Sequence, residues 1–357
     1  MVLESEIVSN YWKFSRVDGA GALIAPVMRF WPSGMVGGYI HEYERCWDID
    51  GGIFRLKNIS GQTTTIFDRY VHDDVGLLSL QGRSTVDTTV QHVLERIPMP
   101  SIRQLGYEPS SDIPVLAVAD TKRAGKRRNL VVLRANEKSL HSQWPVDIDV
   151  DDRNWDLCIS WYGKTPPEDP GFHEYFTHQP NDWKFSSIYK LFLPGSPLLD
   201  YENIYIPDDD LMMSWKDINR LFNIFRIHGL QLAQPSLTGT SFINHQITAH
   251  NPDFYIRYTS FVELMCPIFT REFLQVCLPA FDGTITGWGM DHVWGLLLGR
   301  VPGRIAIIDD VSVTHTRAPQ NSYDLGTGVK EDRLTCTLFK THRPQQTFGG
   351  LLGQHKL

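Results

Sequence analysis

The amino-acid sequence predicts an α/β protein with a β-rich N-terminal region, and three observations support that fold class. From residue 115 onward, short apolar runs alternate with helical patterns, which is typical of a sheet flanked by helices. The first hundred residues instead hold short alternating runs bounded by glycine turns. A chain of 357 residues is also too long for one small core, so we expect two domains, or one large α/β domain with an accessory part.

The N-terminal region is expected to form a small antiparallel sheet. Gly38–His41 and Gly52–Leu56 alternate between apolar and polar residues, and Asp50-Gly51 is a turn signal between them. A helix is expected over Val90–Ile97, because its apolar residues keep the i, i+3, i+4, i+7 spacing and Pro98 follows.

The stretch Pro98–Pro114 is the best candidate for a domain boundary. We therefore expect an accessory region over residues 1–110, an α/β domain over residues 111–320 and a C-terminal tail over residues 321–357, which has little periodicity from Thr341 on. Strands of the second domain are expected at Val115–Ala119, Leu130–Leu133, Leu157–Trp161, Ile204–Ile206, Leu230–Ala233 and Ile305–Ile308.

Two helices of the second domain have clear signals. The first has Ser214 as N-cap, Asp217 at the third helical position and Gly229 as terminator. The second begins near Gly289 and ends at Gly299. Asp291 would then lie in its first turn, where the helix dipole stabilises an anion.

Composition narrows the function classes. A net charge of −7 gives no electrostatic reason to expect nucleic-acid binding. The five cysteines are scattered without a Cys-x-x-Cys pair, so neither a zinc site nor a disulfide framework is expected. No signal peptide and no apolar run long enough for a bilayer is visible. We expect a cytoplasmic protein without a transmembrane segment, and leave open a peripheral association with a membrane.

The run Asp208-Asp209-Asp210 directly follows a β-type apolar segment. Residues two apart on a strand face the same side, so Asp208 and Asp210 can converge on one cation. Oxygen ligands favour Mg²⁺ or Mn²⁺, and His315, at the end of another apolar strand, is the candidate third ligand. The alternatives are a solvated loop of aspartates and a structural histidine.

The segment Thr286–Asp291 combines two glycines, an indole and a carboxylate. Trp288 could stack on a sugar, whereas the alternative is a tight turn with a buried tryptophan. Asp291 could act as a general base or could be only a helix-start residue.

Glycosyl transfer from a nucleoside diphosphate would use these groups. A divalent cation neutralises the leaving diphosphate, so one carboxylate on the acceptor side suffices. Asp291 would take the acceptor's proton in an inverting reaction, and would hold the acceptor in a retaining one.

Residues 129 to about 319 resemble a glycosyltransferase-like domain-of-unknown-function family, number 707, of the GT-A type. The resemblance covers slightly more than half of the chain. Its matching pieces are Asn129–Val132, Asn154–Gly163, Tyr189–Leu193, Tyr205–Asp210, His228–Pro235, Phe261–Pro267 and Gly287–Asp291.

The resemblance implies a GT-A-like, Rossmann-type mixed sheet flanked by helices. It implies a metal-binding Asp-x-Asp motif formed by Asp208 and Asp210, with Asp208 also serving the nucleotide. It further implies that Arg134 and Tyr162 face the nucleotide, that Lys190 meets its phosphates, and that Glu263 and Trp288 line the acceptor side.

We therefore expect a Mn²⁺- or Mg²⁺-dependent glycosyltransferase that moves a sugar from a nucleoside-diphosphate sugar to a glycan or glycolipid acceptor, in surface polysaccharide synthesis. The alternative is a non-catalytic carbohydrate-binding or assembly protein with the same fold. A nucleotidyltransferase is less favoured because no glycine-rich phosphate loop is present.

Overall fold

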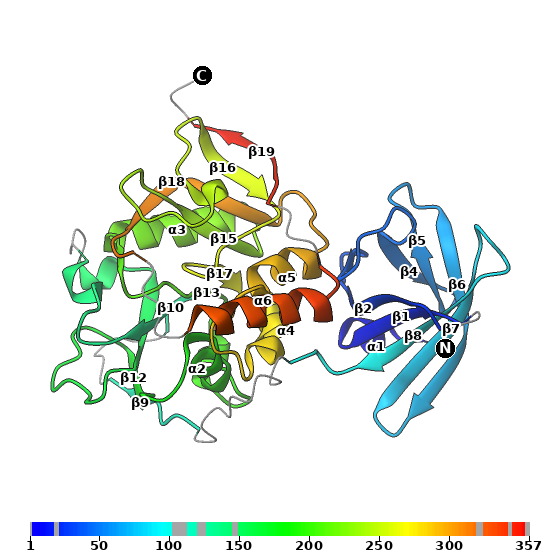
Figure 1. Cartoon of the computed structure of the whole chain (residues 1–357), viewed down its shortest axis with the longest axis horizontal. Coiled ribbons are helices and arrows are strands. Elements are labelled where there is room, and N and C mark those ends of the chain that lie inside the picture. The colour runs from blue at the N-terminus through cyan, green and yellow to red at the C-terminus, as the bar shows by residue number, and fades with distance from the viewer. Residues whose placement is uncertain are drawn as a thin grey trace. The chain divides into compact units, whose positions relative to one another are not determined.

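The computed structural model describes residues 2–17, 21–101, 113–119, 126–144, 149–318, 324–341 and 345–353. The chain forms two compact units, drawn in Figure 1. Unit 1 comprises residues 1–100, 292–301 and 334–343, and unit 2 comprises residues 101–291, 302–333 and 344–357. The expected division near residue 110 thus lies close to the first change of unit, but two later segments also belong to unit 1.

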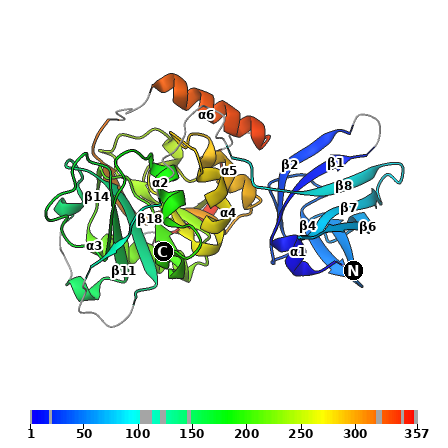
Figure 2. The same cartoon turned by 90° about the horizontal axis from the view of Figure 1, so that it is seen from below.

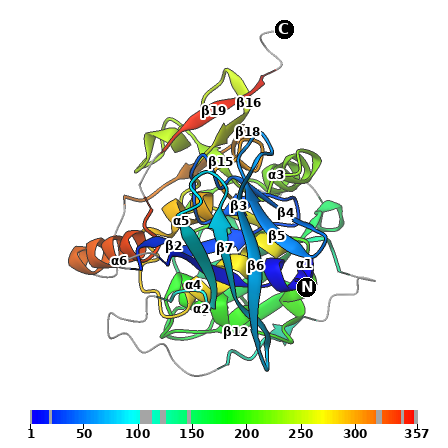
Figure 3. The same cartoon turned by 90° about the vertical axis from the view of Figure 1, so that its right-hand side faces the viewer.

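Unit 1 contains an eight-stranded antiparallel sheet in which strands that follow one another in sequence pair, except β3 and β4 (Figure 3). β8 returns to pair with β1, and a bridge between Met35 and Cys46 joins the ends of β3 and β4, so the meander closes on itself. Its elements are α1 (Glu4–Val8), β1 (Tyr11–Arg16), β2 (Leu23–Phe30), β3 (Val36–Gly37), β4 (Cys46–Asp50), β5 (Ile53–Lys57), β6 (Thr63–Asp73), β7 (Gly76–Ser84) and β8 (Gln91–Ile97).

The inside of this closed sheet is filled by aromatic side chains. Trp12, Phe14, Phe30, Phe54 and Phe67 are buried there, because alternate residues of a strand face the same side. The small antiparallel sheet is therefore closed around a packed core.

The prediction of a helix over Val90–Ile97 is wrong, because Gln91–Ile97 form strand β8, which pairs with β1 and β7. The apolar spacing fitted a helix, but His92 and Leu94 are the inward positions of a strand with period two. Pairing with two neighbouring strands overrides the local pattern. Gly38–His41, expected as strand, lies just beyond β3 and forms none.

Unit 2 contains a mixed α/β sheet, as expected. Its strand order is β19-β16-β18-β15-β17-β13-β10-β11-β12-β9. β10 to β13 run parallel, and β17 is antiparallel to both β13 and β15. The strands are β9 (Ala117–Val118), β10 (Asn129–Ala135), β11 (Trp155–Trp161), β12 (Tyr175–His178), β13 (Asn203–Tyr205), β14 (Leu211–Met212), β15 (Leu232–Leu237), β16 (Phe254–Thr259), β17 (Ile268–Thr270), β18 (Ile305–His315) and β19 (Thr347–Leu352).

Helices cover both faces of this sheet (Figure 2). On β10, Val131 and Leu133 pack with α3 (Trp215–Ile227) in one core cluster. Arg134, the residue after Leu133, points to the other face, where it donates to the Ser187 hydroxyl of α2 (Lys184–Leu191). The period-two alternation of β10 therefore decides which side chains meet which helix.

Three helices follow later in the chain: α4 (Arg271–Phe281), α5 (Met290–Leu297) and α6 (Leu325–Leu338). α3 has the expected capping box of Ser214 and Asp217, and α5 begins beside Gly289 as expected. The segment expected as a tail instead contains α6 and β19. β19 forms because it pairs with β16, a contact that its own sequence does not reveal. Among the described residues, no helix combines the length and apolar character needed to cross a membrane.

Candidate active site at the end of strand β13

The acidic segment lies where the order of the parallel strands reverses. β11 and β12 lie on one side of β10, and β13 lies on the other. Ligands of open α/β sheets bind beyond the carboxyl ends of the strands at such a switch point. Asp208 follows β13 at this end, and its backbone N–H donates to the Met265 carbonyl at 2.8 Å.

Asp208 is paired with a cation that the sequence analysis missed. The Lys184 ammonium lies 2.5 Å from Asp208 Oδ1 and also donates to the carbonyls of Leu264 and Met265, at 2.8 and 3.2 Å. Burial raises the pKa of Asp208, against the lowering effect of Lys184, although 39% of its side chain is exposed. Lys184 thus balances the first outer aspartate.

Asp210 is paired with His315, which the sequence had indicated. β14 and the end of β18 pair in antiparallel register, bringing His315 Nε2 to 3.3 Å from Asp210 Oδ2. His315 Nδ1 lies 2.8 Å from the Phe242 carbonyl oxygen, which can only accept, so Nδ1 must carry a proton. In the neutral imidazole, Nε2 therefore carries a lone pair that can bind a cation. In the protonated imidazole, Nε2 carries a hydrogen and donates to Asp210.

The protonation of His315 follows from this pairing. Burial lowers the pKa of its imidazole, but the hydrogen bonds to Asp210 and Phe242 and the charges of Asp210 and Asp208 raise it, and the net direction is upward. The two outer aspartates therefore each have a basic partner, Lys184 or His315.

Two buried carboxylate oxygens near this pair have no hydrogen-bond partner among the described residues. They are Asp210 Oδ1 and Glu263 Oε2. Burial raises the pKa of Glu263 to about 7; the bond from Asn244 opposes this shift and the charge of Asp208 adds to it. Unsatisfied buried oxygens are costly, so they point to a missing donor or cation.

The donor types suit Mg²⁺ or Mn²⁺, since Asp208 and Asp210 offer oxygens and His315 a nitrogen. The described residues nevertheless include no group of three or more His, Cys, Asp or Glu side chains placed to hold a metal ion. A cation at Asp208 and Asp210 would thus replace contacts that Lys184 and His315 now make. The metal site stays a prediction.

The middle aspartate faces a different set of residues. Tyr162, just after β11, donates to Asp209 Oδ2 at 3.0 Å, and Arg317 lies 3.8 Å from Asp209 Oδ1. Burial raises the pKa of Asp209 to about 6, while the Tyr162 bond lowers it. Tyr162 therefore reaches the acidic segment, and its contact with a nucleotide stays a prediction.

Arg134 and Lys190 make internal contacts instead. Arg134 donates to the hydroxyls of Ser160 and Ser187, and its guanidinium lies 5.2 Å from the centre of the Tyr162 ring. Lys190 Nζ lies 2.7 and 2.8 Å from the two carboxylate oxygens of Asp182. Their predicted contacts with a nucleotide remain predictions, and the geometry gives Arg134 a role in holding Tyr162.

The segment with Trp288 and Asp291 lies against the start of α2. The Phe185 ring is so close to Gly287 that a Cβ there would lie 2.6 Å from it, and the backbone at Gly287 has a φ of +76°. Phe185 directly follows Lys184, which contacts Asp208. One end of α2 therefore touches both candidate segments. Asp291 is buried in the first turn of α5, as expected.

The folded chain thus brings together four of the predicted site residues: Asp208, Asp210, Glu263 and His315. Tyr162 joins them through its hydrogen bond to Asp209. The sequence analysis missed Lys184 and Arg317. Lys184 had a usable signal: it opens a helix right after the parallel strand β12, at the edge where sites form.

No family model matches the chain, and no curated protein matches it either. Crystal structures of S. aureus TarS do match. Residues 1–349 give a TM-score of 0.41 at 10% identity, over 59% of this chain and 65% of that one. The same piece in complex with UDP-GlcNAc gives 0.36 at 12% identity, over 59% and 66%. A further TarS structure gives 0.36 at 11% identity, over 59% and 39%.

The chain therefore spans less than two thirds of each of these TarS chains. Overlap and identity at this level carry no argument about function, and none of these matches assigns the chain to family 707.

Proposed function

We propose that the chain is a metal-dependent glycosyltransferase with a GT-A-like fold, which transfers a sugar from a nucleoside-diphosphate sugar to a glycan or glycoconjugate acceptor. The observation that carries the proposal is the pair Asp208 and Asp210 at the strand-order reversal, with the unpartnered buried oxygen of Asp210 beside it. The mixed sheet, in which β17 runs antiparallel between β13 and β15, agrees with the fold that the family resemblance implies.

Asp208 and Asp210, with His315, would hold the cation, and a bound divalent cation would supply charge neutralisation for the leaving diphosphate. Lys184 is a second positive group beside Asp208 and would meet a phosphate oxygen when the aspartate turns to a cation. Tyr162, held by Arg134, would lie beside the nucleotide.

In the transfer step, the acceptor oxygen forms a bond to the anomeric carbon. The bond from that carbon to the phosphate oxygen breaks, and its electron pair leaves with the diphosphate. We assign Asp291 as the group that takes the acceptor's proton in an inverting reaction. Glu263 and Trp288 would line the acceptor side.

The test is a calorimetric titration of UDP and GDP with and without Mn²⁺. The wild-type protein should bind at least one of them in a Mn²⁺-dependent manner, and Asp210→Ala should lose that dependence. Asp200→Ala is the matched control, because this carboxylate is exposed on the surface and pairs only with Lys126 among the described contacts. Equal Mn²⁺-dependent binding by wild type and Asp210→Ala would contradict the proposal.

One observation favours the alternative of a non-catalytic carbohydrate-binding protein. Lys184 and His315 already pair with Asp208 and Asp210. If these pairs are permanent, nucleotide binding will be absent or independent of Mn²⁺. Binding of oligosaccharides on a glycan array, unchanged in Asp210→Ala, would then support this second function.

A further inference from the structure

Glu331 of α6 is a completely buried carboxylate, with 0% of its surface exposed. It accepts four hydrogen bonds, all from the segment that precedes Trp288. Its Oε2 accepts from the backbone N–H and the hydroxyl of Thr286, both at 2.7 Å. Its Oε1 accepts from the N–H groups of Ile285 and Gly287, at 3.2 and 3.3 Å. One side chain therefore binds three consecutive residues of the loop.

A helix does not need a buried carboxylate at this position. Burying a carboxylate is costly unless its oxygens are fully hydrogen-bonded, and burial indeed raises the pKa of Glu331, although the Thr286 contacts oppose the shift. Here the two oxygens satisfy backbone donors that no regular helix or strand pairs. These contacts indicate that the Glu331 carboxylate fixes the backbone conformation of residues 285–287.

Two other contacts hold the same loop. A Cβ on Gly328, one turn before Glu331, would lie 2.8 Å from Cε3 of the Trp288 ring, so α6 lies directly against the indole. On the other side, the Phe185 ring packs on Gly287. The backbone N–H of Trp288 also donates to the Thr286 hydroxyl at 3.0 Å, which links the backbone of Trp288 to the Glu331 contacts.

The loop needs such support because its backbone is unusual. Gly287 and Gly289 have φ values of +76° and +93°, which side-chain-bearing residues rarely adopt. Glycine-rich loops have many accessible conformations when unrestrained. The hydrogen bonds of Glu331 select one of them, and with it the positions of Trp288 and Asp291.

We propose that Glu331, together with Gly328, is a positioning device of α6 that sets Trp288 and Asp291 for the acceptor. The inference rests on the proposed function for its catalytic part, since Trp288 and Asp291 are the acceptor-side residues there. Glu331 touches no substrate in this scheme and acts only through the loop.

The first experiment measures amide hydrogen exchange of residues 285–287 in Glu331→Gln. The glutamine keeps one oxygen but points an NH₂ group at backbone donors, so it can accept from only one side. Exchange at these amides should become about 10- to 100-fold faster. Lys330→Gln, an exposed neighbour on the same helix, should leave exchange unchanged. Unchanged exchange in Glu331→Gln would overturn the positioning role.

The second experiment measures hydrolysis of the fastest substrate among UDP-glucose, UDP-galactose, UDP-N-acetylglucosamine and GDP-mannose. In Glu331→Gln, kcat should fall about 10- to 100-fold because Asp291 is displaced, while KM for the nucleotide sugar and the Mn²⁺-dependent Kd for UDP stay the same. A merely structural role would leave kcat unchanged when the protein is folded. A loosened loop with normal kcat therefore overturns the catalytic part.

Gly328→Ala protects the test against loss of folding. Alanine favours a helix interior more than glycine does, so α6 should be at least as stable, yet its Cβ must displace the Trp288 ring. The same fall in kcat is expected in protein that still unfolds cooperatively on heating, and normal turnover would count against the device. A wild-type protein that neither binds UDP nor GDP nor hydrolyses any of these sugars defeats the proposed function, and the exchange experiment still decides whether Glu331 holds the loop.

Discussion

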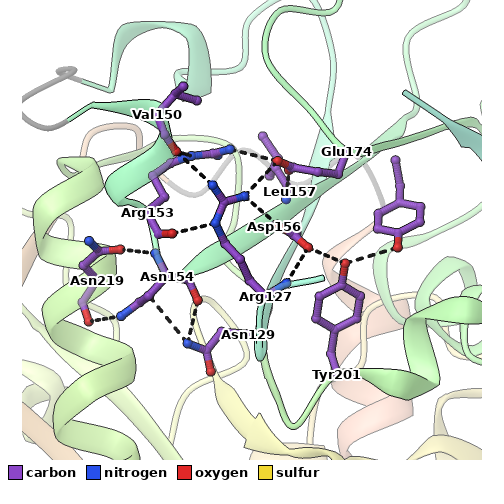
Figure 4. Close-up of polar contacts among 11 residues, drawn as sticks. Arg127, Asn129, Val150, Arg153, Asn154, Asp156, Leu157, Glu174, Tyr201 and Asn219 are labelled. Carbon is purple, nitrogen blue, oxygen red and sulfur yellow. Dashed lines mark hydrogen bonds and ion pairs between the residues drawn. The ribbon is translucent and has the colours of Figure 1, made fainter. Parts of the chain in front are cut away.

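The two ends of the parallel strands β10 and β11 carry buried charge in opposite ways. At the amino ends, Arg127 and Arg153 meet Asp156 and Glu174 in a network that Figure 4 shows. All four carboxylate oxygens there accept hydrogen bonds, including one from Tyr201 to Asp156 at 2.7 Å. The charges of the two arginines and two carboxylates cancel.

Aromatic rings complete this network. The guanidinium of Arg153 lies 4.4, 4.0 and 4.8 Å from the ring centres of Trp155, Phe172 and Trp215. Burial lowers the pKa of Arg153 to about 10, and the Glu174 charge opposes that shift. The group still carries its charge near neutral pH, and the rings replace part of its lost hydration.

At the carboxyl ends, the charges are not fully satisfied. Asp210 and Glu263 each keep a buried oxygen without a partner among the described residues. At the amino ends, Arg153 Nη1 also lacks a hydrogen-bond partner among the described residues, but its guanidinium lies against aromatic rings. The contrast therefore lies in the carboxylates: oxygens that all accept hydrogen bonds serve the fold, whereas a buried carboxylate oxygen without a partner is available for a ligand.

Removing one carboxylate of the amino-end network should be the most damaging change. Asp156→Ala removes the carboxylate that pairs with Arg127 and accepts from the Tyr201 hydroxyl, so the two buried arginines keep only Glu174 as a counter-charge. We expect the free energy of unfolding in urea to fall by about 3–5 kcal/mol. Asp200→Ala, at a carboxylate whose side chain is 68% exposed, should change it little. Equal effects of the two substitutions would show that the network contributes no more than a surface ion pair.

Glu263 should make stability depend on pH. Its pKa is about 7 in the folded protein against an ordinary value of 4.5, so the folded state holds the proton more tightly than the unfolded chain does. The stability it contributes is complete below the ordinary value and is lost as the pH rises through about 7.

Glu263→Gln removes this ionisation. We expect its free energy of unfolding near pH 8 to exceed that of the wild type by up to about 3 kcal/mol, with a flatter pH dependence between about 5 and 8. The exposed Glu272→Gln is the control. The measurement is urea unfolding across the pH series, and identical slopes for all three proteins would contradict the burial effect.

Asp210→Asn should separate stability from binding. The substitution removes the charge of a carboxylate whose Oδ1 has no hydrogen-bond partner among the described residues. The free energy of unfolding should therefore change by less than about 1 kcal/mol. Mn²⁺-dependent affinity for UDP should nevertheless fall by at least about 100-fold, because an amide is a poor metal ligand beside Asp208. Calorimetry and urea unfolding on the same samples check both halves, and a large stability loss with retained binding would reverse the comparison.

The smallest effect is expected at the cap of α3. Ser214 accepts the N–H of Asp217, and Ser214→Ala should lower the free energy of unfolding by about 1 kcal/mol. Its UDP affinity should equal that of the wild type, which makes it a control for unspecific destabilisation. Weakened nucleotide binding in this variant would mean that the site responds to general stability rather than to its own charges.

Local signals in the sequence were sufficient for several elements. Ser214, Asp217 and Gly229 determined α3, because capping and termination depend on residues a few positions apart. The apolar runs determined β10 and β11 for a similar reason, since both strands are buried on both faces. The same local argument located Asp208 at the end of β13.

Other features depend on partners that are distant in sequence. The residues of β8 are strand rather than helix because β1 and β7 pair with them. Lys184, the first residue of α2, lies beside Asp208 at the carboxyl end of the parallel strands. Lys190, farther along the same helix, pairs with Asp182 instead. The bond pattern of Glu331 joins residues 45 or so positions apart, a separation at which sequence spacing carries no information.

By itself, therefore, the sequence determined which residues carry acidic, aromatic and imidazole groups at strand and helix ends, and which strands form an α/β sheet. Only the tertiary structure decided which charges neutralise one another and which oxygens stay unsatisfied. The physical reason is that secondary structure follows from interactions within a few residues, whereas charge pairing and burial depend on side chains that folding brings together from distant parts of the chain.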